Sequence, residues 1–375
     1  MFGAPTLNDI GTLEGTRVIL RMGLNVPLDN VGYVAEPFRV EVLIPTLRRL
    51  KELRARVLVI GHIGTDGVGS LRGVHRYLES RVGSIQFIDH LPFDLSVIND
   101  GGIVILENIR RYAGEKTNDP KLADIIARSG DVFINEAFSD SHRTHASIVG
   151  VATRIPSYIG NWFSREVAEL SAVFQPEHPF VCVVGGAKIA TKLPLVSRLL
   201  ESADTLLLAG ALANDYWDSR GIEVGRSLIS SQADLSAIEN DTVLILPSDV
   251  LVERDGGVVT IAPDAVKSSD RIVDVGAATL VRLKTSLDRA RLVVWNGPLG
   301  NTDEGYSDGT LELARLVAGA PGRAIVGGGD TIAAISKLDL FDRFHFVSTG
   351  GGAMLDYLAN ETLPGIEAIR SYWSR

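Results

Sequence analysis

The sequence is poor in cysteine and has no long apolar run. Cys182 is the single cysteine among 375 residues, so the chain can form no internal disulfide, and no cysteine-rich zinc site is expected. No apolar run approaches the roughly 18 residues that span a membrane, and Met1–Asp9 lacks the basic and apolar regions of a signal peptide. We therefore expect a cytoplasmic protein with no membrane partner.

Basic residues are also few. The 37 lysines and arginines are outnumbered by 46 aspartates and glutamates, which gives a formal net charge of −9. Nucleic-acid-binding domains are usually basic, so nucleic acid is not expected as a partner. The hydrophobic fraction of 45% and the charged fraction of 22% are those of a globular protein, and a chain of this length usually folds as two domains.

Glycine is abundant instead, with 38 residues, and short apolar runs rich in Val, Ile and Leu recur along the chain. Runs without polar alternation are typical of parallel strands that are buried on both faces, and amphipathic segments such as Val40–Arg54 predict helices between them. We therefore predict an α/β fold with two doubly wound parallel-sheet domains joined by a hinge helix. The predicted strands are Arg17–Leu20, Val57–Ile60, Ile103–Leu106, Val132–Ile134, Phe180–Val184, Thr205–Ala209, Val243–Leu246, Leu292–Trp295, Ala324–Val326 and Phe344–Val347.

A domain boundary is predicted near the middle of the chain. The amphipathic segment Asn161–Phe174 is followed directly by Gln175–Pro179, where two prolines flank two polar residues. The predicted division is an N-terminal domain at 1–160, a hinge helix at 161–176, a C-terminal domain at 177–360, and a tail at 361–375 that packs on the N-terminal domain.

Cationic and hydrogen-bonding side chains follow several predicted strands of the first half. Ligands of doubly wound sheets bind outside the carboxyl ends of the strands, and guanidinium groups bind phosphate or carboxylate with two hydrogen bonds. Each residue taken alone is more often a solvated or ion-paired surface residue, whereas the set together predicts an anion site. The set consists of Arg21, Asn25, Arg39, His62, Arg110, Arg111, His142 and Arg143.

Glycine clusters follow predicted strands of the second half. Glycines between a strand and a helix let backbone amides approach a phosphate at the positive helix terminus, which predicts a nucleotide. The P-loop pattern GxxxxGK[ST] is absent, GxGxxG does not occur at the right place, and each cluster alone is compatible with an ordinary tight turn. The clusters are Gly185-Gly186-Ala187-Lys188, Asn296-Gly297-Pro298, Gly327-Gly328-Gly329-Asp330-Thr331 and Gly350-Gly351-Gly352.

Charged residues beside these glycines have two interpretations each. Lys188 and Lys192 lie four residues apart on one helix face, where they either contact the same anion or form a surface stripe. Asp330 follows three glycines at a predicted helix start, where it is either a capping residue or a Mg²⁺ ligand whose other partners are phosphate oxygens and water. Spacing alone leaves both questions open.

Taken in order, these segments resemble the phosphoglycerate kinase family over the whole chain. That family has two domains and transfers a phosphoryl group between ATP and the carboxylate of 3-phosphoglycerate. The resemblance implies Mg²⁺ with ATP or ADP, a small phosphorylated carboxylic acid as the second ligand, hinge closure and a monomer. The segments that carry it are Arg21–Pro27, Phe38–Val40, Gly61–Gly64, Leu106–Arg110, Asn135–Phe138, Ser141–Ser147, Gly185–Lys188, Trp295–Pro298, Gly327–Thr331 and Ser348–Ala353.

The resemblance also implies roles for single residues. The migrating phosphoryl group is expected to contact Arg39, Lys188 and the helix-terminal amides near Gly328 and Gly351. The acid site is expected at Asn25, Arg39, His62, Arg110 and Arg143. The nucleotide site is expected at Gly186, Lys188, Lys192, Asn296, Asp303, Gly327, Gly328, Gly329, Asp330 and Thr331, with Asp330 on Mg²⁺. Residues 301–304 differ from the family's aromatic-containing stretch, so Glu304 is an alternative to Asp303 as the ribose ligand.

Two positions depart from the family pattern, and both fall in the implied acid site. Where the family has Arg-x-Asp-x-Asn, this chain has Gly23 in place of the aspartate, which in the family contacts the substrate hydroxyl. Where the family has His-Leu-Gly-Arg, this chain has Thr65 in place of the final arginine, which binds phosphate in the family. The first expectation is phosphorylation of 3-phosphoglycerate, and the alternatives are a related kinase of another carboxylic acid or a catalytically silent nucleotide-binding protein.

Overall fold

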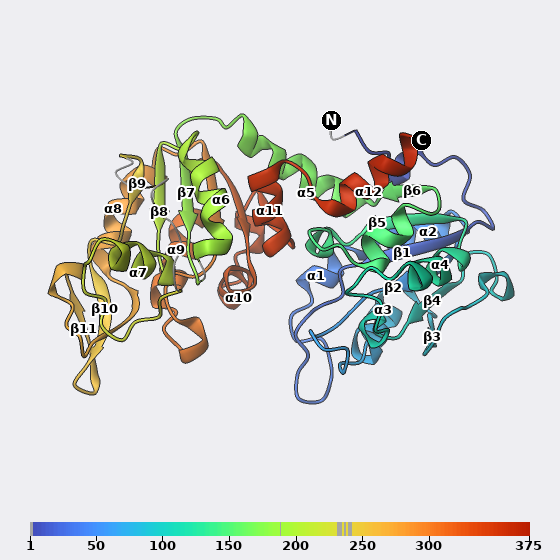
Figure 1. Cartoon of the computed structure of the whole chain (residues 1–375), viewed down its shortest axis with the longest axis horizontal. Helices are drawn as coiled ribbons and strands as arrows, with labels where there is room; N and C mark the ends of the chain where they lie inside the picture. The colour runs from blue at the N-terminus through green and yellow to red at the C-terminus, as the bar shows by residue number, and fades with distance from the viewer. Residues whose placement is uncertain (1–2, 188, 231–234, 236–237, 239–241) are drawn as a thin grey trace. The chain divides into compact units, whose positions relative to one another are not determined.

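The computed structural model describes residues 3–187, 189–230, 235, 238 and 242–375, so the predicted site residue Lys188 lies outside the described residues. The chain divides into two compact units. Unit 1 comprises Met1–Ala168 with Asn360–Arg375, and unit 2 comprises Glu169–Ala359. Each unit contains a six-stranded parallel sheet with helices (Figure 1), which confirms the predicted α/β class.

The sheet of unit 1 has the strand order β3-β4-β2-β1-β5-β6, and all of its neighbouring strands are parallel. Its edge strands β3 and β6 are absent from the sequence prediction, because a strand of three residues gives too short an apolar run. The strands are β1 (Arg17–Met22), β2 (Arg56–Ile60), β3 (Gln86–Ile88), β4 (Ile103–Leu106), β5 (Val132–Glu136) and β6 (Ser157–Ile159). The helices between them include α3 (Arg72–Val82) and α4 (Pro120–Arg128).

The segment expected to be one helix over Val40–Arg54 forms two helices, α1 (Phe38–Glu41) and α2 (Ile44–Glu52). The expectation of a continuous helix is wrong because Pro45 has no N–H and its ring clashes with the carbonyl four residues earlier, at Glu41. Proline is tolerated in the first turn of a helix, so α2 begins at the residue before it. The predicted site residue Arg39 therefore lies in a helix of a single turn.

Helix α5 (Asn161–Ser171) contains the boundary between the units, which falls between Ala168 and Glu169. Its residues 161–168 belong to unit 1, where Phe163 is fully buried. The ring of Phe163 meets that of Phe138 edge-on, with 5.2 Å between the ring centroids. This aromatic pair joins the start of α5 to the segment that follows β5.

The last helix, α12 (Pro364–Trp373), belongs to unit 1. The amide of Gly365 donates to the carbonyl oxygen of Ser141 at 2.9 Å. The indole Nε1 of Trp373 donates to the carbonyl oxygen of Ser157 at 2.7 Å. The end of the chain thus packs on the edge strand β6 and on the segment after β5.

The sheet of unit 2 has the order β15-β14-β13-β7-β8-β9, again with parallel neighbours. Every strand in it was predicted from its apolar run. The strands are β7 (Phe180–Val184), β8 (Thr205–Leu208), β9 (Leu244–Ile245), β13 (Leu292–Asn296), β14 (Arg323–Gly327) and β15 (Phe346–Ser348). The helices are α6 (Ile189–Leu200), α7 (Ala211–Ser219), α8 (Ala277–Leu287), α9 (Asp308–Ala318), α10 (Gly329–Lys337) and α11 (Gly352–Asn360).

Unit 2 also has a small antiparallel sheet that the sequence analysis did not predict. Its order is β11-β10-β12, with β10 (Val250–Arg254), β11 (Gly257–Ile261) and β12 (Arg271–Val275). Asp255 and Gly256 join the first two strands, and both have positive φ, 50° and 81°. An Asp-Gly pair between two apolar runs is a strong hairpin signal, and it was overlooked.

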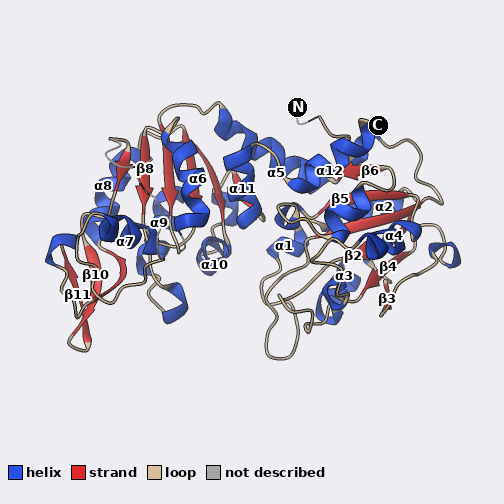
Figure 2. Ribbon diagram, in the orientation of Figure 1, coloured by secondary structure: helices blue, strands red, loops and turns tan. Residues whose placement is uncertain are grey.

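Each parallel sheet has a topological switch point beside its first strand. The loops after β1 and β5 lead to opposite sides of the unit 1 sheet, and the loops after β7 and β13 do so in unit 2. A crevice for ligands forms outside the carboxyl ends of strands at such a point. Figure 2 shows the strands of each unit in red with helices in blue around them. No helix among the described residues is long and apolar enough to cross a membrane.

Candidate functional site

Arg21 is the centre of a buried charged cluster at the switch point of unit 1. It lies near the end of β1 and is 1% exposed. Its Nε donates to Ser147 Oγ at 3.0 Å, and its Nη1 donates to the carbonyl oxygen of Met22 at 2.5 Å. Its Nη2 lies 3.1 Å from Asp140 Oδ2 and 3.2 Å from His62 Nδ1. The guanidinium is therefore fixed and aligns the groups around it.

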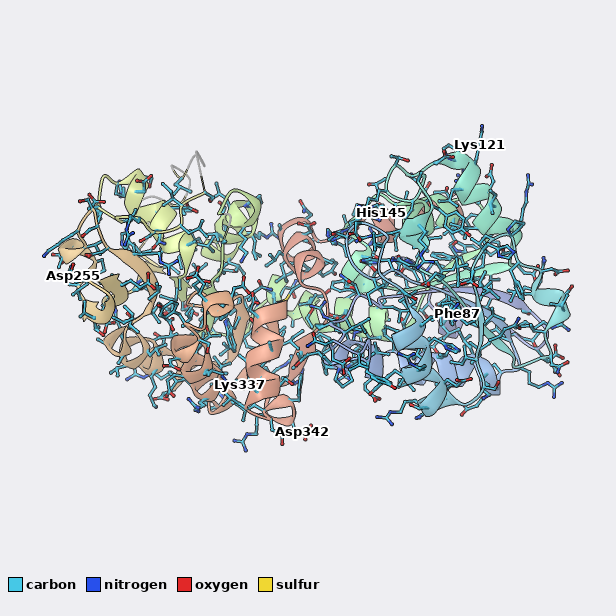
Figure 3. All side chains as sticks on the ribbon, turned by 90° about the horizontal axis from the view of Figure 1, so that it is seen from below. Phe87, Lys121, His145, Asp255, Lys337 and Asp342 are labelled. Carbon is cyan, nitrogen blue, oxygen red and sulfur yellow. The ribbon has the colours of Figure 1, made fainter. Side chains whose placement is uncertain are left out.

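The cluster continues through Ser147 to a second carboxylate. Ser147 Oγ donates to Glu115 Oε1 at 2.6 Å, and Ser147 N donates to Oε2 at 3.0 Å. His145, labelled in Figure 3, has its Nδ1 3.7 Å from Glu115 Oε1. Burial, together with Arg110 and Arg143, lowers the pKa of His145 to about 4, so this imidazole is neutral at pH 7. Burial also raises the pKa of Glu115.

Three side chains of the cluster carry a buried polar atom that has no hydrogen-bond partner in the described part of the chain. These atoms are His62 Nε2, Arg110 Nε and Asp140 Oδ2. Burial lowers the pKa of His62, whereas Arg21 and His62 outweigh burial and hold the pKa of Asp140 well below its usual range. Buried polar atoms are normally satisfied, so unpartnered donors within a cationic cluster indicate the place of an anionic ligand.

Two further residues predicted for the acid site adjoin this cluster. Asn25 is exposed, and its Oδ1 accepts a hydrogen bond at 2.9 Å from the amide of Gly64 in the loop after β2. Arg143 is half-buried, and its Nε donates to His142 Nε2 at 3.2 Å. The positive charge of Arg143 lowers the pKa of Arg110, after the larger effect of burial.

Arg39 and Arg111 differ in whether they form an ion pair with the described residues. Burial lowers the pKa of Arg39, and the negative charge of Asp140 is the largest opposing effect. With the described residues Arg39 forms no ion pair. Arg111 is exposed and pairs with Glu107 at 3.1 Å. The guanidinium of Arg111 is thus already paired with a carboxylate.

The two positions that depart from the family pattern have polar neighbours. A Cβ at Gly23 would lie 2.8 Å from Ser139 Oγ, so the serine hydroxyl occupies the space that a side chain at position 23 would need. The carbonyl oxygen of Thr65 accepts a hydrogen bond from Lys116 Nζ, and the preceding carbonyl accepts one from Arg110 Nη1. A hydroxyl and a cation are therefore present beside the two altered positions.

Unit 2 contains a cavity of about 430 Å³, which is the size of a small-molecule site. Its walls come from the loop after β7, helix α7, strand β12 and the loop after β13. Of the predicted nucleotide residues, Gly186, Asp303 and Asp330 line this cavity. The sequence analysis did not single out other wall residues, among them Asn214, Trp217, Arg226, Leu228 and Asp274.

Glycines let the loops after β7 and β13 approach each other at the cavity rim. A Cβ at Gly185 would collide with the carbonyl of Pro298, and one at Gly297 would collide with the carbonyl of Gly185. Gly186 and Gly297 also have φ of 91° and 92°, a region that residues with a Cβ rarely adopt. The amide of Gly185 donates to the carbonyl oxygen of Asn296 at 2.9 Å. Backbone rather than side chains forms this edge.

Lys192 and Asp330 are two charged groups near this rim. Lys192 Nζ donates to the carbonyl oxygen of Gly185, and burial lowers the pKa of Lys192 to about 8, with Asp330 opposing the shift. Asp330 is exposed in the first turn of α10 and forms no ion pair among the described residues. Because Lys188 lies outside the described residues, the pairing of two lysines on one anion stays a prediction.

The third glycine cluster connects β14 to α10. Gly327 ends β14, Gly328 has φ of 108° and precedes the helix, and Gly329 opens it. Thr331 Oγ1 accepts a hydrogen bond at 3.0 Å from the amide of Gly297. This contact ties the start of α10 to the loop after β13.

Two other predicted positions lie near the same strand ends. Asn296 is buried at the end of β13, and its Nδ2 lies 3.7 Å from Met354 Sδ, a weak acceptor. Gly351 precedes α11 with φ of 51°, and a Cβ there would have no atom within 4 Å. A ligand can therefore approach the N–H groups at this helix start closely.

The two candidate ribose ligands, Asp303 and Glu304, differ in their contacts. Arg271 holds Glu304 with two hydrogen bonds, Nη1 to Oε1 at 3.0 Å and Nη2 to Oε2 at 2.6 Å. Asp303 is exposed, lines the cavity and makes no such bond with the described residues. Both carboxylates line the cavity, and Asp303 is the one without an ion pair among the described residues.

Asp274 is a cavity residue that sequence reasoning missed. It is buried in β12 and accepts hydrogen bonds from the amides of Gly309 at 2.9 Å and Val275 at 2.8 Å. Burial raises the pKa of Asp274 to about 6. The signal that could have found it was a single aspartate among the apolar residues of 272–275.

Comparisons with known proteins agree with this architecture. A family model described as phosphoglycerate kinase matches residues 7–361. Phosphoglycerate kinase of Methylorubrum populi is 36% identical, with 98% of each chain covered. Among solved structures, phosphoglycerate kinase from Coxiella burnetii has 34% identity and a TM-score of 0.80, with 98% of each chain covered. That from Pyrococcus horikoshii OT3 has 27% identity and a TM-score of 0.86, with 99% of each covered.

The matches extend over both units, over both parallel sheets and over the residues that form the cationic cluster and the cavity rim. The chain therefore belongs to the phosphoglycerate kinase family of phosphotransferases that act on a carboxyl group.

Proposed function

We propose that the chain transfers a phosphoryl group from Mg²⁺-ATP to a carboxylate, with 3-phosphoglycerate as acceptor and 1,3-bisphosphoglycerate as product. The observation that carries this proposal is the buried cationic cluster of unit 1, in which His62 Nε2 and Arg110 Nε lack a partner within the described chain. A phosphorylated acid supplies the acceptor oxygens that these donors need. In the same proposal the cavity of unit 2 holds the nucleotide.

The chemistry that we propose needs alignment and charge neutralisation rather than a covalent enzyme intermediate. A carboxylate oxygen of the acid attacks the γ-phosphorus, the bond to the β–γ bridging oxygen breaks, and ADP leaves. Arg39 on the acid side and Lys188 on the nucleotide side neutralise charge on the migrating group. Backbone N–H groups near Gly328 and Gly351 donate to its oxygens.

The residues present fit a nucleotide-bound magnesium ion. Asp330 is an exposed carboxylate that lines the cavity, and the described residues contain no cluster of three or more His, Cys, Asp or Glu that would hold a metal by itself. Magnesium on nucleotides is usually bound by one or two carboxylates with phosphate oxygens and water. When bound, the ion would neutralise phosphate charge, and the part of Asp330 is to hold it.

The altered acid site motivates a second candidate, a kinase of a related acid that lacks the hydroxyl or the phosphate. Gly23 and Thr65 each remove a specific contact that the family pattern contains. Ser139 and Lys116, however, place a hydroxyl and a cation beside these positions. We therefore favour 3-phosphoglycerate as the acceptor, with a raised KM.

A carboxylate panel tests the acceptor. ADP release and acyl phosphate formation are measured with Mg²⁺-ATP and hydroxylamine, which traps acyl phosphates as hydroxamates. We expect hydroxamate from 3-phosphoglycerate. Efficient turnover of a non-phosphorylated acid in its place would establish the second candidate. Absence of hydroxamate from every acid would indicate a catalytically silent nucleotide-binding protein.

Hinge closure also belongs to the proposal, because the acid and the nucleotide must meet for transfer to occur. We propose 161–176 as the hinge, 1–160 as the acid domain and 177–360 as the nucleotide domain. Small-angle scattering is expected to show a smaller radius of gyration only when both ligands are bound. Equal radii with neither, either and both ligands would contradict closure. A cytoplasmic location and a monomeric state are further predictions from the family.

A further inference from the structure

The imidazole of His62 lies between a guanidinium and a carboxylate. Its Nδ1 is 3.2 Å from Arg21 Nη2 and 3.4 Å from Asp140 Oδ2. A guanidinium donates hydrogen bonds and accepts none, so in the neutral ring Nδ1 accepts from Arg21 and the proton resides on Nε2. The residue is 1% exposed, which leaves bulk water no part in this arrangement.

Two atoms of this group have unused hydrogen-bonding capacity. His62 Nε2 and Asp140 Oδ2 are both buried without a hydrogen-bond partner among the described residues, although Arg21 Nη2 lies 3.1 Å from Asp140 Oδ2. A second proton on the ring would satisfy both at once. Nδ1–H would then donate to Asp140, and Nε2–H would donate to an anion bound on the other side of the ring.

Charged groups face His62 from three elements. Arg21 comes from β1, Arg110 from the 3-10 helix Ile109–Arg111, and Asp140 from the 3-10 helix Phe138–Asp140. Around these lie Arg39, Arg143, Glu115 and His145. Burial and the two arginines lower the pKa of His62, while Asp140 raises it.

The ligand-free ring is therefore neutral at pH 7. An anion next to Nε2 adds a negative charge and favours the imidazolium. Asp140 is the one carboxylate among the groups that directly face His62 from the described chain, so it is the group that can accept Nδ1–H.

We propose that Asp140 is a positioning residue for His62, and that binding of the phosphorylated acid is coupled to the uptake of one proton by the His62 imidazole. The proton comes from solvent, and the ring becomes a cation with Nδ1–H on Asp140 and Nε2–H on the ligand. The identity of the ligand rests on the proposed function, whereas the coupling applies to any oxyanion that occupies the cluster.

The first experiment follows His62 in the full chain by nitrogen-15 NMR, with sulfate as the probe because sulfate does not titrate near neutral pH. Without sulfate, the neutral ring is expected to carry its proton on Nε2. Sulfate is expected to raise the His62 pKa in the wild type and to leave it almost unchanged in Asp140→Asn. A neutral ring protonated on Nδ1, or no response to sulfate in the wild type, would overturn the proposal even if the variant failed to fold.

The second experiment measures proton uptake by calorimetry of 3-phosphoglycerate binding in buffers of different ionisation enthalpy. In the pH interval between the free and bound pKa values of His62, we expect about one proton per ligand and an affinity that rises about tenfold per pH unit as the pH falls. Asp140→Asn is expected to abolish the uptake and flatten this profile. Asp131→Asn is the matched control, because Asp131 is an exposed carboxylate of the same unit that pairs with Arg17.

Retained uptake in Asp140→Asn, with binding intact, would overturn the proposal. If 3-phosphoglycerate does not bind while sulfate still shifts the His62 pKa, the coupling stands and the proposed acceptor is wrong. The two failures are therefore distinguishable.

Discussion

The two units share a six-stranded parallel sheet with a switch point beside the first strand, yet they build the ends of those strands differently. In unit 1 the strand ends carry fixed charges, with Arg21, Asp140 and Glu115 buried in one network. In unit 2 the strand ends carry glycines, and the backbones of Gly185 and Gly297 approach closely. One architecture thus carries two different kinds of candidate anion site.

The difference has a physical consequence. A site made of ionisable side chains depends on pH and on the identity of each group. A site made of backbone N–H groups depends on the absence of Cβ atoms and on helix termini. Substitutions and pH changes should therefore act on the two units in different ways.

The largest effect is expected for the two cations that we assign to the migrating phosphoryl group. Arg39→Ala and Lys188→Ala should each lower kcat by about 10²–10³-fold, or about 2.7–4 kcal/mol, because each removes a charge directed at the transition state. Both variants should leave nucleotide affinity comparatively intact, because a charge directed at the transition state contributes little to ground-state binding. Steady-state kinetics with separate binding measurements check this. Unchanged turnover in either variant would remove that residue from the mechanism.

Acid should affect the two units in opposite directions. The folded pKa of His145 is about 4, below its unfolded value of about 6.5, so its contribution to unfolding free energy, up to about 3 kcal/mol, is lost as the pH falls through that interval. The folded pKa of Asp274 is about 6, above its unfolded value, so its contribution favours folding at low pH and is lost as the pH rises through about 6.

Urea unfolding between pH 4 and 7 tests this opposition. His145→Asn should flatten the acid-side loss of stability, and Asp274→Asn should steepen it. Identical pH profiles for the wild type and His145→Asn would show that this histidine titrates normally in the folded chain.

A pair of glycine substitutions compares backbone space in the two units. Gly297→Ala places a Cβ at φ of 92° and against a backbone carbonyl, so it should destabilise by about 1–3 kcal/mol. Gly23→Ala meets only the hydroxyl of Ser139, which can rotate away, so its cost should be below about 1 kcal/mol. Thermal or urea unfolding measures both. Equal costs would contradict the contrast between the two strand ends.

The next comparison concerns Asp330, which we propose as the magnesium ligand of unit 2. Asp330→Asn keeps an oxygen but loses the charge that holds a hard cation, so half-maximal activity should need at least about tenfold more magnesium, or about 1.4 kcal/mol. Asp342→Asn, at an exposed residue of the same unit, is the control. An unchanged magnesium dependence would make Asp330 a helix-start residue only.

The smallest effect is expected at Lys116, an exposed cation beside Thr65. Lys116→Ala should raise KM for 3-phosphoglycerate by a few-fold with kcat unchanged, in line with about 0.2–1 kcal/mol for an exposed charge. Lys121→Ala, an exposed lysine of the same unit, is the control. A rise in KM for both variants would indicate a general charge effect.

Much of the fold was predictable because buried parallel strands read as continuous apolar runs. The strands of the parallel sheet of unit 2 follow from those runs alone. The edge strands β3 and β6 were not found, because a strand of three residues gives too short a run. The antiparallel sheet was not found although its Asp-Gly hairpin signal is present in the sequence. The break between α1 and α2 was visible in Pro45 but was not used.

The sequence by itself determined the residue types that follow each strand: cations and Asn25 in the first half, and glycines in the second. This was possible because the end of each strand determines at which edge of the sheet the following residues lie. Only the tertiary structure decided which of these groups are engaged. Arg111 pairs with Glu107 and Glu304 pairs with Arg271, whereas His62 Nε2 and Arg110 Nε have no partner among the described residues.

Asp140 is a residue that the sequence pattern did not identify. Its carboxylate has no distinctive spacing in the sequence, yet it lies 3.1 Å from Arg21 and 3.4 Å from His62, residues more than 70 positions away. Ion pairing, desolvation and tautomer choice depend on distances of a few ångströms between such remote positions. The sequence pattern identifies candidate site residues, and packing in three dimensions determines their charge and their partners.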